Sequence, residues 1–141
     1  TSITSPQKMS AKGKQHDDMW EYYPQGLEAC IMRFWERYKK PIIITENGIC
    51  TADDTKRVQA LSDYMLTLSN ARRKGADVRG YYHWTAWDNF EWTLGPTFKF
   101  GLYACDPVTK VRTKKPSADV YSKLAFTKEI DIKVCERAGE H

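Results

Sequence analysis

The sequence predicts an α/β fold, because helical and β-branched segments alternate along it. Apolar residues recur at three and four spacing before Lys39, a β-branched run follows at 42–45, and a second helical pattern leads to a second β run at 79–84. The 141 residues allow one ordinary domain, and 41% hydrophobic residues suffice for a folded core.

The first predicted helix spans 24–39, because Pro24 fits a first helical turn and Pro41 ends the segment. The run 42–45 then predicts a short strand, ending at Glu46, of the kind buried on both faces in a parallel sheet. The side chains expected on the inner face of the helix, with Cys30 as a core thiol, are Leu27, Cys30, Ile31, Phe34, Trp35 and Tyr38.

A polar stretch at 51–56 precedes a second predicted helix at 57–74, with Gly75 as its stop. The strand at 79–84 follows, and then a hairpin of 99–105 with 110–113 around Asp106-Pro107. A last helix starts at Pro116. The side chains expected to face inward are Val58, Leu61, Met65 and Leu68 in the second helix and Val120, Tyr121, Leu124 and Ala125 in the last.

Residues 1–18 predict a polar surface loop or arm, and 128–141 a C-terminal tail. Between them, two parallel strands are too few to bury both faces of a sheet, whereas a closed eight-stranded barrel needs about 250 residues. The chain is therefore either a small α/β layer or part of a larger fold.

Charge and cysteine spacing exclude several classes of protein. A net charge of +4 is weak for nucleic-acid binding, and no apolar run approaches the ~20 residues of a membrane span. The four cysteines form no C-x-x-C pair and no His lies at ligand spacing, so a zinc site is not expected, and the absence of N-x-[ST] sequons fits the cytoplasm. No metal or organic cofactor is expected. The basic cluster predicts the solvated face of an edge strand and consists of Lys110, Arg112, Lys114 and Lys115.

Glu46 is the first candidate for chemistry, since an acidic side chain at the carboxyl end of an apolar strand stands where barrel enzymes carry catalytic groups. The alternative is that Asn47-Gly48 only marks a tight hairpin turn. The next ten residues, most of them polar, lead into a helix and argue against a returning strand.

The segment 81–92 is the second candidate, because it combines three Trp, two carboxylates, a His and an Asn. Aromatic faces stack on the C–H faces of sugars, and carboxylates and amides bind their hydroxyls. The alternative is a loop whose Trp residues cap the core. His83, on the strand, is expected to be a satisfied core residue.

Several motifs occur in the order found in one enzyme family, over about 20–125. They closely resemble the C-terminal part of glycoside hydrolase family 1, the β-glucosidase and β-galactosidase family. The motifs are Tyr23-Pro24-Gln25-Gly26-Leu27, Thr45-Glu46-Asn47-Gly48, Gly80-Tyr81-Tyr82-His83-Trp84, Asp88-Asn89-Phe90-Glu91-Trp92, Phe100-Gly101-Leu102 and Lys115-Pro116-Ser117-Ala118. The resemblance implies that 19–127 supply about strands seven and eight, with their helices, of a (β/α)₈ barrel that hydrolyses β-glycosides with retention.

The resemblance also implies residue roles. Glu46 matches the nucleophile, whereas Trp84, Glu91 and Trp92 match residues that hold the glycone, with Glu91 on its 4- and 6-hydroxyls. Phe100 is expected to line the same pocket, and Trp87 to touch the aglycone. A carboxylate at 91 would repel a 6-phosphate, so a neutral sugar is expected.

The chain departs from the family pattern in three respects. Gly95-Pro96 replaces the family's Gly-Tyr, and Lys99 replaces its Arg. The Asn-Glu-Pro motif that carries the family's acid/base is absent, and Glu91 is not expected to replace it. The acid/base therefore has to come from an N-terminal segment, on a separate chain or a cleaved part.

Three functions follow as hypotheses. The first is the C-terminal fragment of a retaining β-glycosidase, with the activity of a β-glucosidase, inactive alone. The alternative is a catalytically inactive carbohydrate-binding or interaction module that uses the surface from Trp84 to Trp92. A nucleic-acid binder rests only on the basic cluster.

Overall fold

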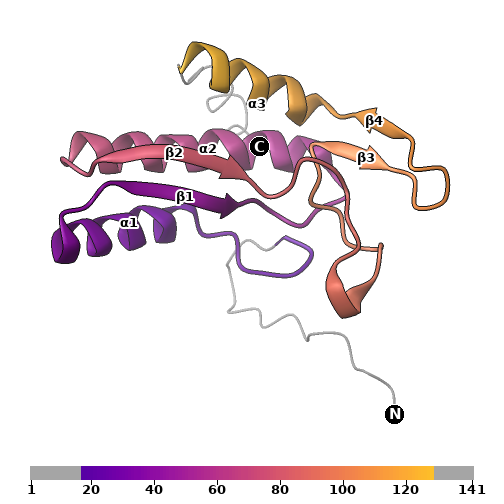
Figure 1. The fold of residues 1–141 in the computed structure, drawn as a ribbon, viewed down its shortest axis with the longest axis horizontal. Helices are drawn as coiled ribbons and strands as arrows, with labels where there is room; N and C mark the ends of the chain where they lie inside the picture. The colour runs from indigo at the N-terminus through magenta and orange to yellow at the C-terminus, as the bar shows by residue number, and fades with distance from the viewer. Residues whose placement is uncertain (1–16, 129–141) are drawn as a thin grey trace, which may run out of the picture.

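The computed structural model describes residues 17–128, which form a layered α/β unit (Figure 1). Of the predicted arm and tail, only Asp17, Asp18 and Lys128 lie inside the described residues. The elements are α1 (Pro24–Tyr38), β1 (Ile42–Asn47), α2 (Asp54–Arg73), β2 (Val78–His83), the 3₁₀ turn η1 (Trp92–Leu94), β3 (Tyr103–Cys105), β4 (Arg112–Lys114) and α3 (Pro116–Thr127).

The two longer strands, β1 and β2, pair in parallel, with Ile42 opposite Val78 and Asn47 opposite His83. β3 and β4 form the predicted antiparallel hairpin, shorter than expected. Because α2 connects β1 to β2, Asn47-Gly48 does not turn into a returning strand, and the hairpin interpretation of these two residues is wrong.

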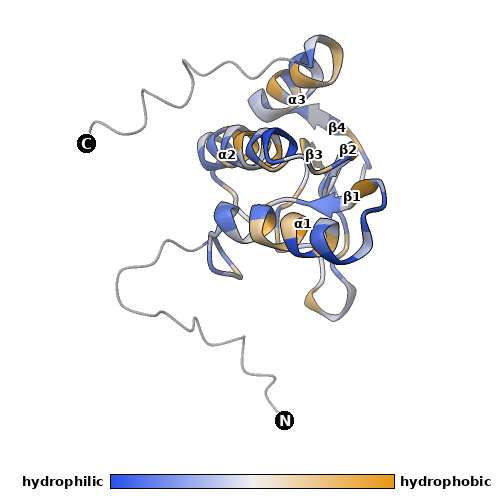
Figure 2. Ribbon diagram, turned by 90° about the vertical axis from the view of Figure 1, so that its left-hand side faces the viewer, coloured by the Kyte–Doolittle hydropathy of each residue, from blue (hydrophilic) through white to orange (hydrophobic). Residues whose placement is uncertain are grey.

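All three described helices lie on one side of the β1–β2 sheet (Figure 2). Ile31 of α1 and Leu68 of α2 form a buried cluster with Val78 of β2. On the opposite face of the sheet Ile43 is 56% exposed, and Tyr82 is also exposed. Burial of 42–45 on both faces is therefore wrong for this chain, because no described element covers the second face.

The inner face of α1 is narrower than its periodicity predicts. Leu27 and Trp35 pack beside Ile31 against the core. Phe34 instead stacks on Tyr38 at the surface, with ring centroids 6.1 Å apart. The side chains predicted inside but found exposed are Cys30, Phe34 and Tyr38.

The second helix begins at Asp54, three residues before the predicted start, because Asp53 accepts a hydrogen bond from the Thr55 N–H at 3.0 Å and caps it. Gly75, at φ +97°, follows its end as predicted. Leu61 and Leu68 are buried, and Val58 and Met65 are half-buried.

The last helix, α3, starts at Pro116 as predicted, but it buries its first turn rather than its middle. Ser117 and Ala118 are buried, because the carboxylate of Asp54 accepts both the N–H and the hydroxyl of Ser117, each at 2.8 Å. Of the residues predicted inside, Val120, Tyr121 and Leu124 are half-buried and Ala125 is exposed. None of the helices within 17–128 is both long and apolar enough to cross a bilayer.

Candidate active site

Glu46 and Trp84 lie at the carboxyl edge of the two parallel strands. The Trp84 N–H donates to the Asn47 carbonyl at 2.9 Å, and the Tyr81 hydroxyl donates to Asn47 Oδ1 at 2.9 Å. Glu46, the residue before Asn47, is exposed. The structure therefore brings the ends of both predicted strands together, as parallel pairing requires.

The turn after β1 depends on a glycine. A Cβ built on Gly48 would lie 2.0 Å from the Trp84 carbonyl oxygen, so only glycine allows this backbone approach. The chain following Glu46 therefore stays in contact with the chain that follows β2.

The segment 85–103 folds back on itself beside this edge. The Thr85 N–H donates to Phe100 O at 3.3 Å, and the Leu102 N–H donates to Thr85 O at 3.0 Å. The Asp88 N–H donates to Tyr103 O at 2.9 Å. Residues 89–99 thus form a loop whose two ends are held side by side.

Glu91 and Trp92 lie in that loop, at the start of η1. The Asn89 side-chain amide donates to Glu91 Oε2 at 2.9 Å, which fixes one oxygen of this half-buried carboxylate. Trp92 is exposed, with φ at 48°.

Phe100 is buried rather than open to a pocket, since only 1% of its surface is exposed. Trp20 lies against it, with ring centroids 5.8 Å apart, and is itself 53% exposed. The Asp17 carboxylate accepts the Cys50 N–H at 2.9 Å, and the Asp18 N–H donates to Cys50 O at 2.8 Å. The segment before α1 is thereby held against the loop after β1, a contact that no local pattern predicts.

The guanidinium of Arg112 lies over the ring of Trp87 in a cation–π contact. Arg112 Cζ is 4.5 Å from the ring centroid. Lys110, Arg112 and Lys114 of the basic cluster are exposed, as the prediction of a solvated face expects. Lys114 pairs with exposed Asp119, whereas Lys115 pairs with buried Asp88 at 3.0 Å. The prediction of a solvated face is wrong for Lys115.

Arg57 is fully buried and braces two loops, a role for which the sequence gives no local signal. Its guanidinium donates to Thr51 O and to Lys99 O, the latter at 2.8 Å, and forms an ion pair with Asp54. Thr51 follows the Glu46 strand and Lys99 precedes Phe100, so Arg57 ties these two segments together.

Lys99 and Pro96, the two expected departures from the family pattern, contact each other. The Lys99 ammonium donates to the Pro96 carbonyl at 2.9 Å. Lys99 therefore bonds within its own loop.

His83 is half-buried and only partly satisfied. Its Nε2 lies 3.4 Å from Phe100 O, whereas Nδ1 has no hydrogen-bond partner among residues 17–128. Burial lowers the pKa of His83 to about 4.

This pKa predicts a loss of stability in acid. The unfolded chain takes up the proton near pH 6.5 and the folded chain only near 4, so stability is complete above 6.5 and falls as the pH drops toward 4. Urea midpoints at pH 7.5 and 5 should therefore differ more for the wild type than for His83→Gln. Equal pH dependence in the two proteins would contradict this.

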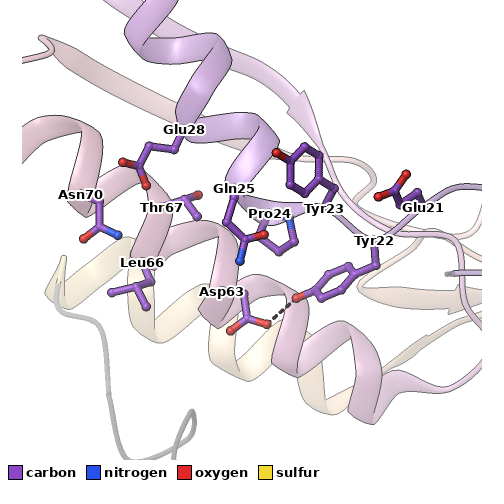
Figure 3. A pocket seen from close by; sticks show the side chains of 10 residues that line it. All are labelled: Glu21, Tyr22, Tyr23, Pro24, Gln25, Glu28, Asp63, Leu66, Thr67 and Asn70. Carbon is purple, nitrogen blue, oxygen red and sulfur yellow. Dashed lines mark hydrogen bonds between the residues drawn. The ribbon is translucent and has the colours of Figure 1, made fainter. Parts of the chain in front are cut away.

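A cavity of about 730 Å³ lies elsewhere, between the segment before α1, the start of α1 and the outer side of α2 (Figure 3). Figure 3 shows the Tyr22 hydroxyl directed at Asp63, to which it donates a hydrogen bond. None of the sequence-predicted site residues lines it. Among the described residues no group of three or more His, Cys, Asp or Glu side chains could hold a metal ion.

Solved structures similar to this chain are glycosidases. A β-glycosidase from Pyrococcus horikoshii superposes with a TM-score of 0.86 and 36% identity, over 95% of this chain and 32% of that chain. The fold, together with these structures, thus shows this chain to be part of a glycoside hydrolase (β/α)₈ barrel, which confirms the predicted fold class.

The family model of glycosyl hydrolase family 1 matches residues 1–130, and the chain belongs to this family. The β-galactosidase of Sulfolobus acidocaldarius is 39% identical over 105 residues, or 74% of this chain and 21% of that protein. Beta-glucosidase 47 of Arabidopsis thaliana is 43% identical over 110 residues, which cover 73% of this chain and 21% of that protein. A 6-phospho-beta-galactosidase of Streptococcus mutans also matches. The chain spans about a fifth to a third of the length of these relatives.

Proposed function

We propose that this chain is the C-terminal part of a retaining β-glycosidase in which Glu46 is the nucleophile. The supporting observation is an exposed carboxylate at the carboxyl end of β1, beside the end of β2. In the proposed reaction the Glu46 carboxylate attacks the anomeric carbon while an acid from the N-terminal segment protonates the leaving oxygen. That group then removes a proton from water, which attacks the glycosyl ester and frees Glu46.

The proposed substrate is a neutral β-glycoside, in the first instance a β-glucoside. Trp84 and exposed Trp92 offer aromatic faces, and the Glu91 carboxylate, held by Asn89, is suited to accept sugar hydroxyls. Exposed Trp20, packed on Phe100, adds a further aromatic surface. The negative charge of Glu91 argues against a 6-phosphate.

The proposed partner is an N-terminal segment that carries the other strands of the barrel. Within residues 17–128, β1 and β2 pair only with each other, and Ile43 and Tyr82 are exposed on the uncovered face. Phe126 of α3 is exposed as well. Apolar side chains and free strand edges of this kind are the surfaces that further strands and helices of a barrel cover.

The proposal includes a cytoplasmic location, supported by the thiols. Cys30, Cys50 and Cys105 are all free. Burial raises the pKa of the Cys50 thiol to about 12, which keeps it protonated and unreactive.

The test uses a completed enzyme, defined as the Pyrococcus horikoshii β-glycosidase with its matched region replaced by this chain. We expect it to hydrolyse an aryl β-glucoside and to leave the 6-phosphorylated analogue uncut, whereas the 141-residue chain alone hydrolyses neither. A completed enzyme that folds but hydrolyses neither substrate would contradict the proposal. Intact-mass spectrometry of the natural protein would reveal whether a larger polypeptide accompanies the chain.

A further inference from the structure

Lys115, between β4 and α3, is held in a nearly enclosed ion pair. Its ammonium lies 3.0 and 3.2 Å from the two oxygens of Asp88 and donates to Gly101 O at 2.8 Å. Asp88 Oδ1 in turn accepts the Gly101 N–H at 2.9 Å. Because the side chains of Lys115 and Asp88 are only 16% and 5% exposed, water screens this pair little.

Both residues of the ion pair bind the backbone of Gly101: Asp88 accepts its N–H, and Lys115 donates to its carbonyl. A Cβ on Gly101 would lie 2.2 Å from Asp88 N and 2.5 Å from Tyr103 O, so the two chain segments meet there without an intervening side chain. Asp88 stands at the start of the loop 89–99, and Gly101 lies just beyond its end. The ion pair therefore fastens the two ends of this loop to each other and, through Lys115, to the start of α3.

The loop that is closed in this way carries Glu91. Asn89, next to Asp88, donates to Glu91 Oε2 at 2.9 Å, and the Glu91 N–H donates to Gly95 O at 2.9 Å. The Lys115 ammonium is thus connected to the Glu91 carboxylate by its ion pair with Asp88, the peptide bond from Asp88 to Asn89, and the hydrogen bond from Asn89 to Glu91.

We propose that Lys115 is a positioning residue, which orients Glu91 for the sugar by fastening the ends of the loop 89–99. The proposal rests on the function proposed above for Glu91. Lys115 touches no substrate in this account; it acts through Asp88 and Asn89.

The neighbouring lysine provides a matched control. Lys114 also forms an ion pair, but with Asp119 of α3 rather than with a residue beside the loop, and both side chains are at least half exposed. Lys114→Met and Lys115→Met change the net charge equally, one residue apart. Only the second leaves a buried carboxylate unpaired.

Hydrogen exchange of the 141-residue chain tests, without any enzyme assay, whether Lys115 holds the two ends of the loop 89–99 together. We expect Lys115→Met to speed exchange in 85–103 while α1 exchanges as in the wild type, and Lys114→Met to change neither. If Lys115→Met fails to fold, Asp88→Asn/Lys115→Met removes both charges and serves instead. Unchanged exchange in 85–103 of the folded variant, or an equal increase in every segment, would overturn the proposal.

A double-mutant cycle in the completed enzyme tests the link to Glu91. We expect Lys115→Met to lower kcat/KM for the glucoside by about ten- to a hundredfold, and by less than about twofold when Glu91 is already Ala. Additive effects would show that Lys115 acts elsewhere and would overturn the proposal. If the unmutated completed enzyme has no turnover, the proposed function fails, and the exchange experiment still decides whether Lys115 orders the loop.

Discussion

Glu46→Gln in the completed enzyme should lower kcat for the aryl β-glucoside by roughly 10³-fold or more, while KM changes little. The amide keeps the size of the carboxylate but cannot attack the anomeric carbon, so the covalent step is lost rather than substrate binding. Glu36→Gln, an exposed residue on α1, is the matched control and should retain wild-type turnover. Steady-state kinetics on the three proteins measure both constants.

Mass spectrometry gives an independent check of the same residue. An activated glycoside whose ester intermediate hydrolyses slowly should add one glycosyl unit to the wild-type protein, on the peptide that contains Glu46. The Glu46→Gln protein should gain no mass. Labelling at another carboxylate, or full activity of Glu46→Gln, would remove Glu46 as the nucleophile.

Asp54→Ala should lower the free energy of unfolding by about 3–5 kcal/mol, the usual cost of leaving a buried charge without its partner. Asp54 neutralises the fully buried Arg57 and also binds the first turn of α3 through Ser117. The substitution removes both contacts at once. Urea unfolding followed by tryptophan fluorescence measures the change.

The control for this stability experiment is Asp77→Ala, which breaks an ion pair with Arg79 in which both side chains are exposed. It should shift the urea midpoint little, because water replaces the lost contact. If Asp54→Ala lowers the free energy of unfolding no more than Asp77→Ala does, then the Asp54–Arg57 ion pair does not stabilise the fold as expected.

The order of helices and strands could be predicted from the sequence because each depends on nearby residues. Pro24 and Pro116 begin helices, and the β-branched run at 42–45 forms β1. The predicted start of α2 lies three residues too late, because Asp53 and Asp54 continue a polar stretch of sequence and only the hydrogen bond from the Thr55 N–H identifies Asp53 as the helix cap. The exposure of Phe34 and Ile43 could not be predicted from the sequence. Periodicity shows which side chains share one face of a helix or strand, but not whether another element covers that face.

The candidate site was predictable in part for the same reason. Parallel pairing alone brings Glu46 and Trp84 to one edge. Phe100 packs against Trp20, eighty positions earlier in the chain. The Arg57 and Lys115 contacts likewise join segments that no local pattern links. The roles of Glu46, Trp84, Trp87, Glu91, Trp92 and Phe100 in binding or chemistry stay predictions.

The uncovered β1–β2 sheet also bears on how the chain behaves in isolation. Within residues 17–128 each strand has one edge without a strand beside it, and unpaired backbone of this kind is a template for another chain. The proposed N-terminal segment would occupy both edges and leave none free for a further copy of the chain. Without that segment, we expect copies of this chain in excess to pair edge to edge and to grow into aggregates, because such pairing always leaves a further edge free.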